Sequence, residues 1–308
     1  TLLHRYRRQI RRAGAERAEK GGNTRHRGHL PAARPRTHGK SRLRYMFEKL
    51  EKLRLRKALF YFPFSLKSYI LTRKEIKKLR KSNYIYNIPS YTNIKIWLPS
   101  LKNLHEIDLI QRIIFFKKDF FEGEMLRKVL KHYFKEKRKY TIVDVGGNIG
   151  NHSIFFATQV ENSVIYTFEP IPEIYAILRK NIEINNLLNK VKLYNYACGA
   201  NEGNASIYHA DVQNIGATSI IKDSSGTLKI IKLDDILNNK EIDFIKIDVE
   251  GFEYDVLIGA QNILKNYSPI VWIEIFPENY IKITKLLNKL SYKKFEKLDE
   301  KNFVFKKY

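Results

Sequence analysis

The sequence predicts an α/β fold built on a doubly wound, mostly parallel sheet, and three observations in residues 140–308 support this. Short apolar, β-branched runs alternate with segments in which apolar residues recur at helical spacing, a glycine-rich turn follows the first run, and two strands joined by a short polar turn end the chain. Strands that alternate with helices favour parallel pairing through right-handed crossovers. The closing hairpin adds an antiparallel strand, so we expect a mixed sheet.

The elements that precede this alternation are expected to be two short strands and two helices. Residues 84–98 are rich in aromatic and β-branched side chains, and Pro89 with Ser90 divides them into two strands. Residues 104–116 and 123–134 show the apolar spacing of helices.

Within the alternating region, each element is expected to end where its periodic pattern stops. The strands are expected at residues 140–145, 164–168, 191–198, 206–209, 228–233, 242–247, 269–275, 292–298 and 302–305, and the helices at residues 152–160, 174–186, 254–264 and 280–290. The stretch between the strands at 206–209 and 228–233 is polar and contains glycine, so it is assigned to no element.

The net charge of +25 is concentrated in the first 140 residues. Residues 1–45 hold 14 basic and 2 acidic residues, residues 46–140 hold 24 and 9, and residues 141–308 hold 19 and 21. The half that carries the motifs described below is therefore nearly neutral, unlike a surface for polyanions. The apolar content of 44% excludes disorder throughout, and the single cysteine, Cys198, excludes a disulfide within the chain and a multi-cysteine zinc site.

The composition predicts three parts of the chain. Residues 1–45 are Arg-rich, and the change of composition near Met46 indicates a disordered or non-native tail upstream of the natural start. The alternative is a basic tail that binds polyanions. Residues 46–100 are expected to form a basic extension of helix and strands, and residues 101–308 the domain that carries the motifs.

The basic extension contains an aromatic and apolar run, residues 58–71, between two basic clusters. This arrangement is typical either of a helical hairpin packed on the following domain or of contact with an anionic membrane surface, here through residues 46–80. No run reaches the roughly 18 uninterrupted apolar residues of a membrane span. We therefore expect a cytoplasmic protein, with a peripheral position at the inner face of the membrane as the further alternative.

The first motif is a buried strand, residues 142–145, that runs into a turn containing Gly146, Gly147 and Gly150. Glycine lets the backbone turn sharply and approach a ligand closely. The next strand ends at Glu169, where a carboxylate can accept both hydroxyls of a ribose. The turn fits neither the G-x-G-x-x-G fingerprint nor a phosphate-binding P-loop, so an adenosine ligand without phosphates, such as S-adenosylmethionine, suits it best.

The second motif, residues 242–253, places three carboxylates just past the fourth core strand: Asp248, Glu250 and Glu253. The carboxyl ends of parallel strands meet at one edge of a sheet, so these groups should lie beside the glycine turn.

Together these segments resemble the FkbM family of S-adenosylmethionine-dependent methyltransferases. The matching pieces, in the order of the family, are residues 143–150, 168–170, 233–235 and 246–251, with weaker matches at 214–219, 259–260 and 273–274. The resemblance covers roughly residues 120–308, and Gly147 departs from it because the family usually has alanine there. It implies a class I methyltransferase (Rossmann-like) fold with a seven-stranded mixed sheet, preceded here by the helical, basic extension.

The resemblance also implies which residues bind the cofactor. The glycine turn and its neighbours shape the methionine side of the site: Asp144, Gly146, Gly147, Asn148 and Gly150. Glu169 takes the ribose, and the adenine lies near residues 197–199.

For the catalytic step, a hydroxyl acceptor must be positioned and must lose a proton. Asp248 and Glu250 are placed to do this, although Glu250 is as well suited to cap the following helix. His209, in the insert between the third and fourth strands, is a further candidate base, whereas His152 more often serves local structure. We predict no metal site, although Asp211 could join the two carboxylates around a divalent ion.

The resemblance suggests O-methylation of a hydroxyl on a glycan, a lipid-linked molecule or another small molecule. An RNA or DNA methyltransferase is the first alternative, motivated by the charge of residues 1–140, but Val-Glu-Gly follows Asp248 in place of the Pro-Pro-aromatic used on exocyclic amines. Nucleic acid is therefore not expected as a partner. The other alternative is a membrane-surface protein with a degenerate methyltransferase fold, against which the intact glycine turn and Glu169 argue.

Overall fold

The computed structural model describes residues 66–102, 107–211 and 214–307, and it leaves the side chains of residues 66–73, 209–211 and 215 undescribed. The expected tail and most of the aromatic run therefore lie outside the described residues. The chain divides into two compact units. One contains α4 (Leu66–Lys81), whose last turn is basic, and the other contains the residues from Ser82 onward. None of the helices within the described ranges is long and apolar enough to cross a membrane.

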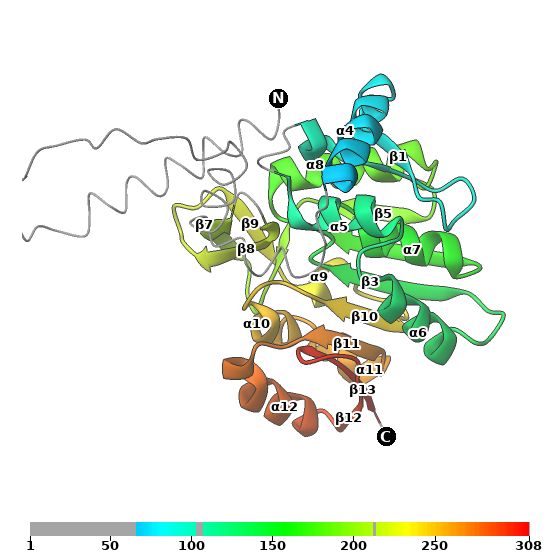
Figure 1. Ribbon diagram of the computed structural model, residues 1–308. Helices are drawn as coiled ribbons and strands as arrows, with labels where there is room; N and C mark the ends of the chain where they lie inside the picture. The colour runs from blue at the N-terminus through cyan, green and yellow to red at the C-terminus, as the bar shows by residue number, and fades with distance from the viewer. Residues whose placement is uncertain (1–65, 103–106, 212–213, 308) are drawn as a thin grey trace, which may run out of the picture. The chain divides into compact units, whose positions relative to one another are not determined.

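A seven-stranded mixed sheet forms the core of the second unit (Figure 1), as the sequence predicts. Its order is β12-β13-β11-β10-β3-β4-β5. The strands are β3 (Tyr140–Val145), β4 (Ser163–Phe168), β5 (Val191–Tyr194), β10 (Phe244–Ile247), β11 (Ile270–Glu274), β12 (Tyr292–Lys297) and β13 (Asn302–Lys307). The strands β11, β10, β3, β4 and β5 pair in parallel, and β13 pairs antiparallel with both β11 and β12. The strand order reverses between β3 and β10, which is where ligands bind in open α/β sheets.

Helices cover both faces of this sheet, and strands such as β3 and β10 are accordingly buried along almost their whole length. The helices are α5 (Leu109–Lys117), α6 (Gly123–Tyr133), α7 (Asn151–Gln159), α8 (Pro172–Ile184), α9 (Leu233–Ile236), α10 (Glu253–Ile258), α11 (Gln261–Asn266) and α12 (Tyr280–Lys289). On one face, Phe244 of β10 contacts Phe156 of α7 and Phe134, which directly follows α6. On the other face, the next residue, Ile245, belongs to the cluster that α10, α11 and α12 complete.

Two smaller sheets accompany the core. β1 (Ile85–Asn87) and β2 (Lys95–Trp97) form an antiparallel pair, and four strands form a sheet in the order β6-β9-β7-β8. These four are β6 (Ala197–Cys198), β7 (Gly203–Asp211), β8 (Asn214–Lys222) and β9 (Leu228–Ile231). The short 3-10 helices η1 (Pro99–Lys102) and η2 (Pro277–Asn279) complete the described elements.

Two predicted elements were wrong in detail, and one strand was not predicted. The single strand expected at 191–198 is two strands in different sheets, because Asn195 turns the chain by donating its side-chain amide to the carbonyl oxygens of Glu169 and Pro170 (2.8 and 3.0 Å). The helix expected at 254–264 is broken into α10 and α11. The polar stretch after residue 209 contains β8, which the sequence does not reveal.

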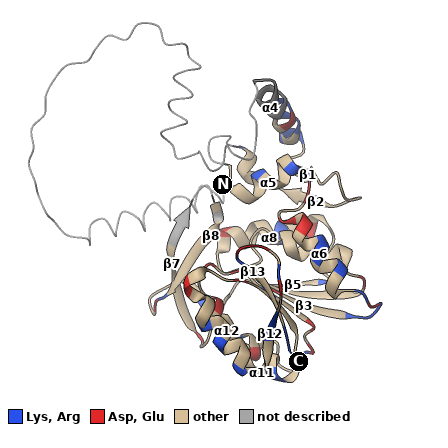
Figure 2. Cartoon of the chain, turned by 60° about the horizontal axis from the view of Figure 1, so that its bottom comes forward, with Lys and Arg blue, Asp and Glu red and all other residues tan. Residues whose placement is uncertain are grey.

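Basic residues lie on α6, α12 and β12 (Figure 2). On β12 and β13 several of them cover aromatic rings, as Lys306 does with its Nζ 4.0 Å from the ring centre of Phe295. In the interior, Lys246 is the buried cation of the described chain, with 2% of its surface exposed. Such a charge needs compensation nearby, and the site below provides it.

Candidate functional site

A pocket opens beyond the carboxyl ends of the central parallel strands. Its wall includes residues at or just after the ends of β3, β4, β10 and β11: Gly146, Gly147, Asn148, Glu169, Pro170, Asp248, Val249, Glu250 and Glu274. Ala197 and Cys198 of β6, the region expected to hold an adenine, also line it, as do Gly216 and Thr218 of β8. The two sequence motifs therefore meet in one pocket.

The glycine turn and the acidic motif touch through their backbones. Gly146 has φ 82°, and a Cβ atom there would overlap the carbonyl oxygen of Asp248. The amide of Asp248 donates to the carbonyl oxygen of Val145 (3.0 Å), which fixes the two strand ends beside each other. Asn148 continues the turn with φ 48°, a conformation that asparagine tolerates well. Glycine at 146 is thus required by both its conformation and the close approach.

Gly147, the departure from the family pattern, lines the pocket next to this turn. A Cβ atom there would overlap Cγ2 of Thr167. Glycine at 147 is therefore matched to the threonine on β4.

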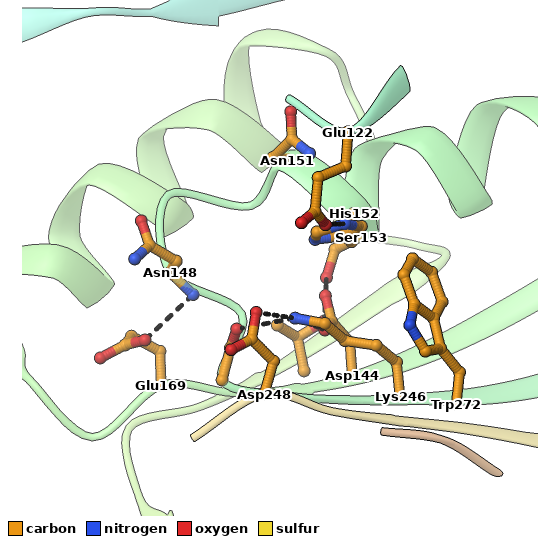
Figure 3. A network of polar contacts seen from close by, with 12 residues as sticks. Glu122, Asp144, Asn148, Asn151, His152, Ser153, Glu169, Lys246, Asp248 and Trp272 are labelled. Atoms are coloured by element: carbon orange, nitrogen blue, oxygen red, sulfur yellow. Dashed lines mark hydrogen bonds and ion pairs between the residues drawn. The ribbon is translucent and has the colours of Figure 1, made fainter. Parts of the chain in front are cut away.

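Glu169 is buried, with 5% of its surface exposed, and both of its oxygens are oriented by backbone amides. Oε2 accepts from the amide of Asn148 (Figure 3) and Oε1 from the amide of Ile171, each at 3.0 Å. A carboxylate offers about four acceptor sites, so two remain for a ligand. Burial raises the pKa of Glu169 to about 7, against which the two amides act. A rigid carboxylate with two vacant acceptor sites fits the paired hydroxyls of a ribose.

Asp144 and Gly150 support the turn from beneath and are not among the residues that line the pocket. Asp144 is fully buried and accepts a hydrogen bond from Ser153 Oγ at 2.6 Å. Gly150, with φ 90°, precedes the first residue of α7, and a Cβ atom there would crowd Leu178. Their expected part in cofactor binding stays a prediction, and these contacts indicate that they would act through the turn.

Lys246 joins the two motifs. In the register of the sheet it lies beside Asp144 of β3 and Trp272 of β11. Its Nζ lies 3.6 Å from Asp144 Oδ1 and 3.1 Å from Asp248 Oδ2, and it donates to the carbonyl oxygen of Gly146 at 3.4 Å (Figure 3). Burial favours the neutral amine, but the charges of Asp248 and Asp144 prevail and raise the pKa of Lys246.

The acidic side of the pocket gathers Asp248, Glu250 and Glu274, whose nearest oxygens all lie within 4.8 Å of one another. Glu274 thus joins the two carboxylates predicted from the sequence. Burial raises the pKa of Glu250 to about 7 and that of Glu274 to about 9, and the charge of Asp248 adds to both shifts. Burial is the largest single effect on Asp248 and acts in the same direction, but Lys246 and the other groups around the carboxyl together outweigh it and lower its pKa.

Carboxylates this close can share a proton or surround a cation. Positive charge is already supplied by Lys246 and by Lys301, whose Nζ lies 3.6 Å from Glu274 Oε1. We therefore assign no metal to the cluster.

Glu250 occupies a left-handed backbone conformation, φ 51°, which costs energy for a residue of this type. It does not cap the following helix. The carboxylate of Glu253 instead accepts from the amide of Gly251 at 2.6 Å, and no side chain caps the start of α10. Strained residues cluster at functional sites, so the conformation favours a role for Glu250 in the pocket.

Two histidines were considered in the sequence. His152 lines the pocket, with Nε2 3.1 Å from Oε2 of Glu122 and its ring edge-on to Trp272. His209 pairs with Ser219 between β7 and β8, but its side chain lies outside the described ones, so its role as a base stays a prediction. Glu122 was missed in the sequence because it lies in an irregular turn, with φ 58°, that no motif marks.

Comparison with known proteins finds a matching family model and several similar proteins. A family model described as the methyltransferase FkbM domain matches residues 144–294. The chain is 29% identical over 152 residues to the hexuronic acid methyltransferase AglP of Haloferax volcanii, a match that covers 47% of this chain and 60% of that protein. It is 27% identical over 146 residues to Methyltransferase 1 of Beauveria bassiana, covering 39% of this chain and 58% of that protein. The matches thus span about three fifths of the length of these curated relatives.

Among solved structures, the chain is similar to a methyltransferase FkbM from Methylobacillus flagellatus. The TM-score is 0.41 and the identity 17%, over 55% of this chain and 44% of that one.

Proposed function

Residues 144–294 belong to the FkbM methyltransferase domain family, and from this premise we propose that the chain transfers the methyl group of S-adenosylmethionine to a hydroxyl group of a glycan, a lipid-linked sugar or another small molecule. The observation that carries the proposal is the position of Glu169, a buried and doubly oriented carboxylate, in the same pocket as Asp248. The name of the Haloferax volcanii relative, a hexuronic acid methyltransferase, supports a glycan as the acceptor.

Each residue then has a definite task. When bound, S-adenosylmethionine supplies a methyl group made electrophilic by its sulfonium. Glu169 holds the ribose hydroxyls with its two vacant acceptor sites, and the glycine turn lets the backbone approach the methionine part. Asp248 takes the proton that the acceptor hydroxyl loses while its oxygen bonds to the methyl carbon, and the electron pair of the broken carbon–sulfur bond stays on sulfur.

The cofactor assignment is tested by calorimetric titration with S-adenosylhomocysteine. We expect the wild-type chain to bind it and Glu169→Ala to bind at least tenfold more weakly. Glu183→Ala is the matched control, because Glu183 pairs with Arg179 on the outer surface of α8 and does not line the pocket. The proposal fails if the wild-type chain does not bind, or if Glu169→Ala binds as the wild type does.

The acceptor class is tested by transfer of a tritiated methyl group to neutral methyl glycosides, methyl glucuronides and short RNA. Labelling of a glycoside or glucuronide supports the proposal, and labelling of RNA alone contradicts it.

We further propose a cytoplasmic location, with residues 46–80 at an anionic membrane surface. The basic and aromatic composition of that segment supports this. Flotation with phosphatidylserine vesicles tests it: binding should be lost with phosphatidylcholine alone and after removal of residues 46–80. Equal flotation with both vesicle types contradicts it.

A further inference from the structure

We propose that Glu274 is a positioning residue that shares a proton with Asp248 and thereby holds the Asp248 carboxylate ionised at the pocket wall. The inference rests on the proposed methyl transfer, in which Asp248 accepts the proton of the acceptor. The sequence leaves Glu274 either as an acceptor contact or as a charge at the end of a strand.

The register of the sheet brings the two carboxyl groups together. β10 and β11 pair in parallel, with Ile247 opposite Ile273, so Asp248 and Glu274 occupy equivalent positions at the ends of the two strands. Their nearest carboxyl oxygens, together with that of Glu250, lie within 4.8 Å of one another. A carboxylate oxygen can only accept, so a hydrogen bond between two carboxyl groups requires a proton on one of them.

The surrounding charges decide which group holds this proton. Lys246 on β10 lies 3.1 Å from Asp248 and stabilises its negative charge, and His152 of α7 lines the same pocket. Glu274 faces the carboxylate of Glu250 from the loop after β10, and its counter-charge is the more distant Lys301 at 3.6 Å.

The same surroundings raise the pKa of Glu274 to about 9, through burial first and the charge of Asp248 second. They lower that of Asp248, chiefly through Lys246, against the effect of its burial. The proton therefore resides on Glu274, which donates to Asp248.

The role of Glu274 follows from this donation. A neutral carboxyl group fixes the neighbouring carboxylate by a hydrogen bond without adding charge to the pocket. If Glu274 lost its proton, two negative charges would face each other and Asp248 would be displaced from its position. The amide of glutamine can donate in the same way but cannot ionise, so Glu274→Gln separates a donor role from a base role.

The proton is observed directly by carbon-13 NMR of the chain labelled at the glutamate side-chain carboxyls, with S-adenosylhomocysteine present. We expect one glutamate resonance to titrate near pH 9 and to be absent from Glu274→Gln. In the control Glu278→Gln, whose site is exposed on η2, this resonance should remain. The proposal is overturned if no glutamate titrates above pH 8, if the resonance persists in Glu274→Gln, or if Mg²⁺ removes the titration and EDTA restores it.

The functional consequence is read from the pH dependence of methyl transfer to the best glycoside of the panel. We expect Glu274→Ala to lower the rate at least tenfold and Glu274→Gln to restore most of it. The wild-type rate should fall above pH 9, and that of the glutamine variant should not. If glutamine is as damaging as alanine, Glu274 acts as a base and the proposal is wrong.

The two proposals fail separately. Absence of S-adenosylhomocysteine binding by the wild-type chain removes the proposed function. The NMR titration, repeated then on the unliganded chain, still decides where the proton lies.

Discussion

The ammonium group of Lys246 lies 3.6 Å from the carboxylate of Asp144, and this ion pair connects the two strands that carry the sequence motifs. Asp144 has no exposed surface, and its Oδ1 has no hydrogen-bond partner among the described residues. Lys246 is therefore the main compensation for that oxygen. Lys246 also contacts Asp248 in the pocket wall. The ion pair should therefore affect both the stability of the fold and the position of Asp248.

We predict that Lys246→Met lowers the free energy of unfolding by about 3 kcal/mol, because it leaves Asp144 buried without its partner. Chemical denaturation monitored by circular dichroism measures this. Lys222→Met is the matched control, since Lys222 is half exposed in its pair with Asp255, and its loss should cost less than about 1 kcal/mol. Equal losses for the two variants would contradict the assigned role of Lys246.

We also predict that Gly146→Ala is destabilising by at least about 2 kcal/mol, because its left-handed conformation and the oxygen of Asp248 both exclude a Cβ atom. Gly203→Ala is the control: nothing lies within 4 Å of a Cβ atom there, so the change should stay within about 0.5 kcal/mol. Denaturation midpoints of both variants check this. A tolerated alanine at 146 would mean that the turn can relax away from Asp248.

The fold could be predicted from the sequence where apolar periodicity is strong. The central strands and most helices lie within a few residues of their expected bounds, because each buries an apolar face or both faces. The break between α10 and α11 could not be seen, since it depends on a distant contact: a Cβ atom at Gly259 would overlap the carbonyl oxygen of Gly199. The separation of β5 from β6 likewise depends on the side-chain amide of Asn195 reaching back to the end of β4.

The sequence predicts those residues of the candidate site that directly follow a strand within a motif, and it misses those that come from turns elsewhere in the chain. Glu169 and Asp248 follow β4 and β10, and parallel pairing alone brings such ends to one edge. Lys301 comes from the turn between β12 and β13, and Glu122 from the turn before α6, so their arrival at the pocket depends on tertiary structure. Lys246 stands out in the sequence as a charged residue within an otherwise apolar strand. A charge in such a strand indicates a buried ion pair, here with Asp144 and Asp248.

One matched segment of the family pattern, residues 233–235, has a structural explanation. The carboxylate of Asp234 accepts from the amides of Asn262 and Ile263, each at 3.0 Å, at the start of α11. We predict that Asp234→Ala costs about 1 kcal/mol of stability, as the loss of a helix cap does, without changing affinity for S-adenosylhomocysteine.

Denaturation and calorimetric titration of the same Asp234→Ala preparation measure the two effects. The neighbouring Asp235→Ala is the control, because Asp235 makes an exposed pair with Lys232. A tenfold loss of affinity in Asp234→Ala would assign the residue to the cofactor site instead.

Glu169 predicts how cofactor affinity depends on pH. Its pKa is raised to about 7 by burial, and in the proposed function the ionised form is the one that would accept two ribose hydroxyls. As the pH falls from 8 to 6 the carboxylate is protonated, so affinity for S-adenosylhomocysteine should weaken by about tenfold. Calorimetric titration across this range should give a sloping profile for the wild type and a flat, weaker one for Glu169→Gln. Glu250→Gln should keep the slope. Glu250 also has a raised pKa, but it belongs to the cluster with Asp248 and Glu274 and is not the residue proposed to hold the ribose.

The stability of the unliganded chain should depend on pH in the opposite sense. Between the ordinary pKa of 4.5 and the folded-state value of about 7, the unfolded chain has lost the proton of Glu169 and the folded chain retains it. Folding then binds a proton, so this contribution to stability decreases as the pH rises through that window. Thermal denaturation without ligand should therefore show a smaller loss of stability from pH 5 to pH 8 in Glu169→Gln than in the wild type. If the two profiles coincide, Glu169 is ionised in the folded chain throughout this range, and the predicted decline of affinity at pH 6 should be absent as well.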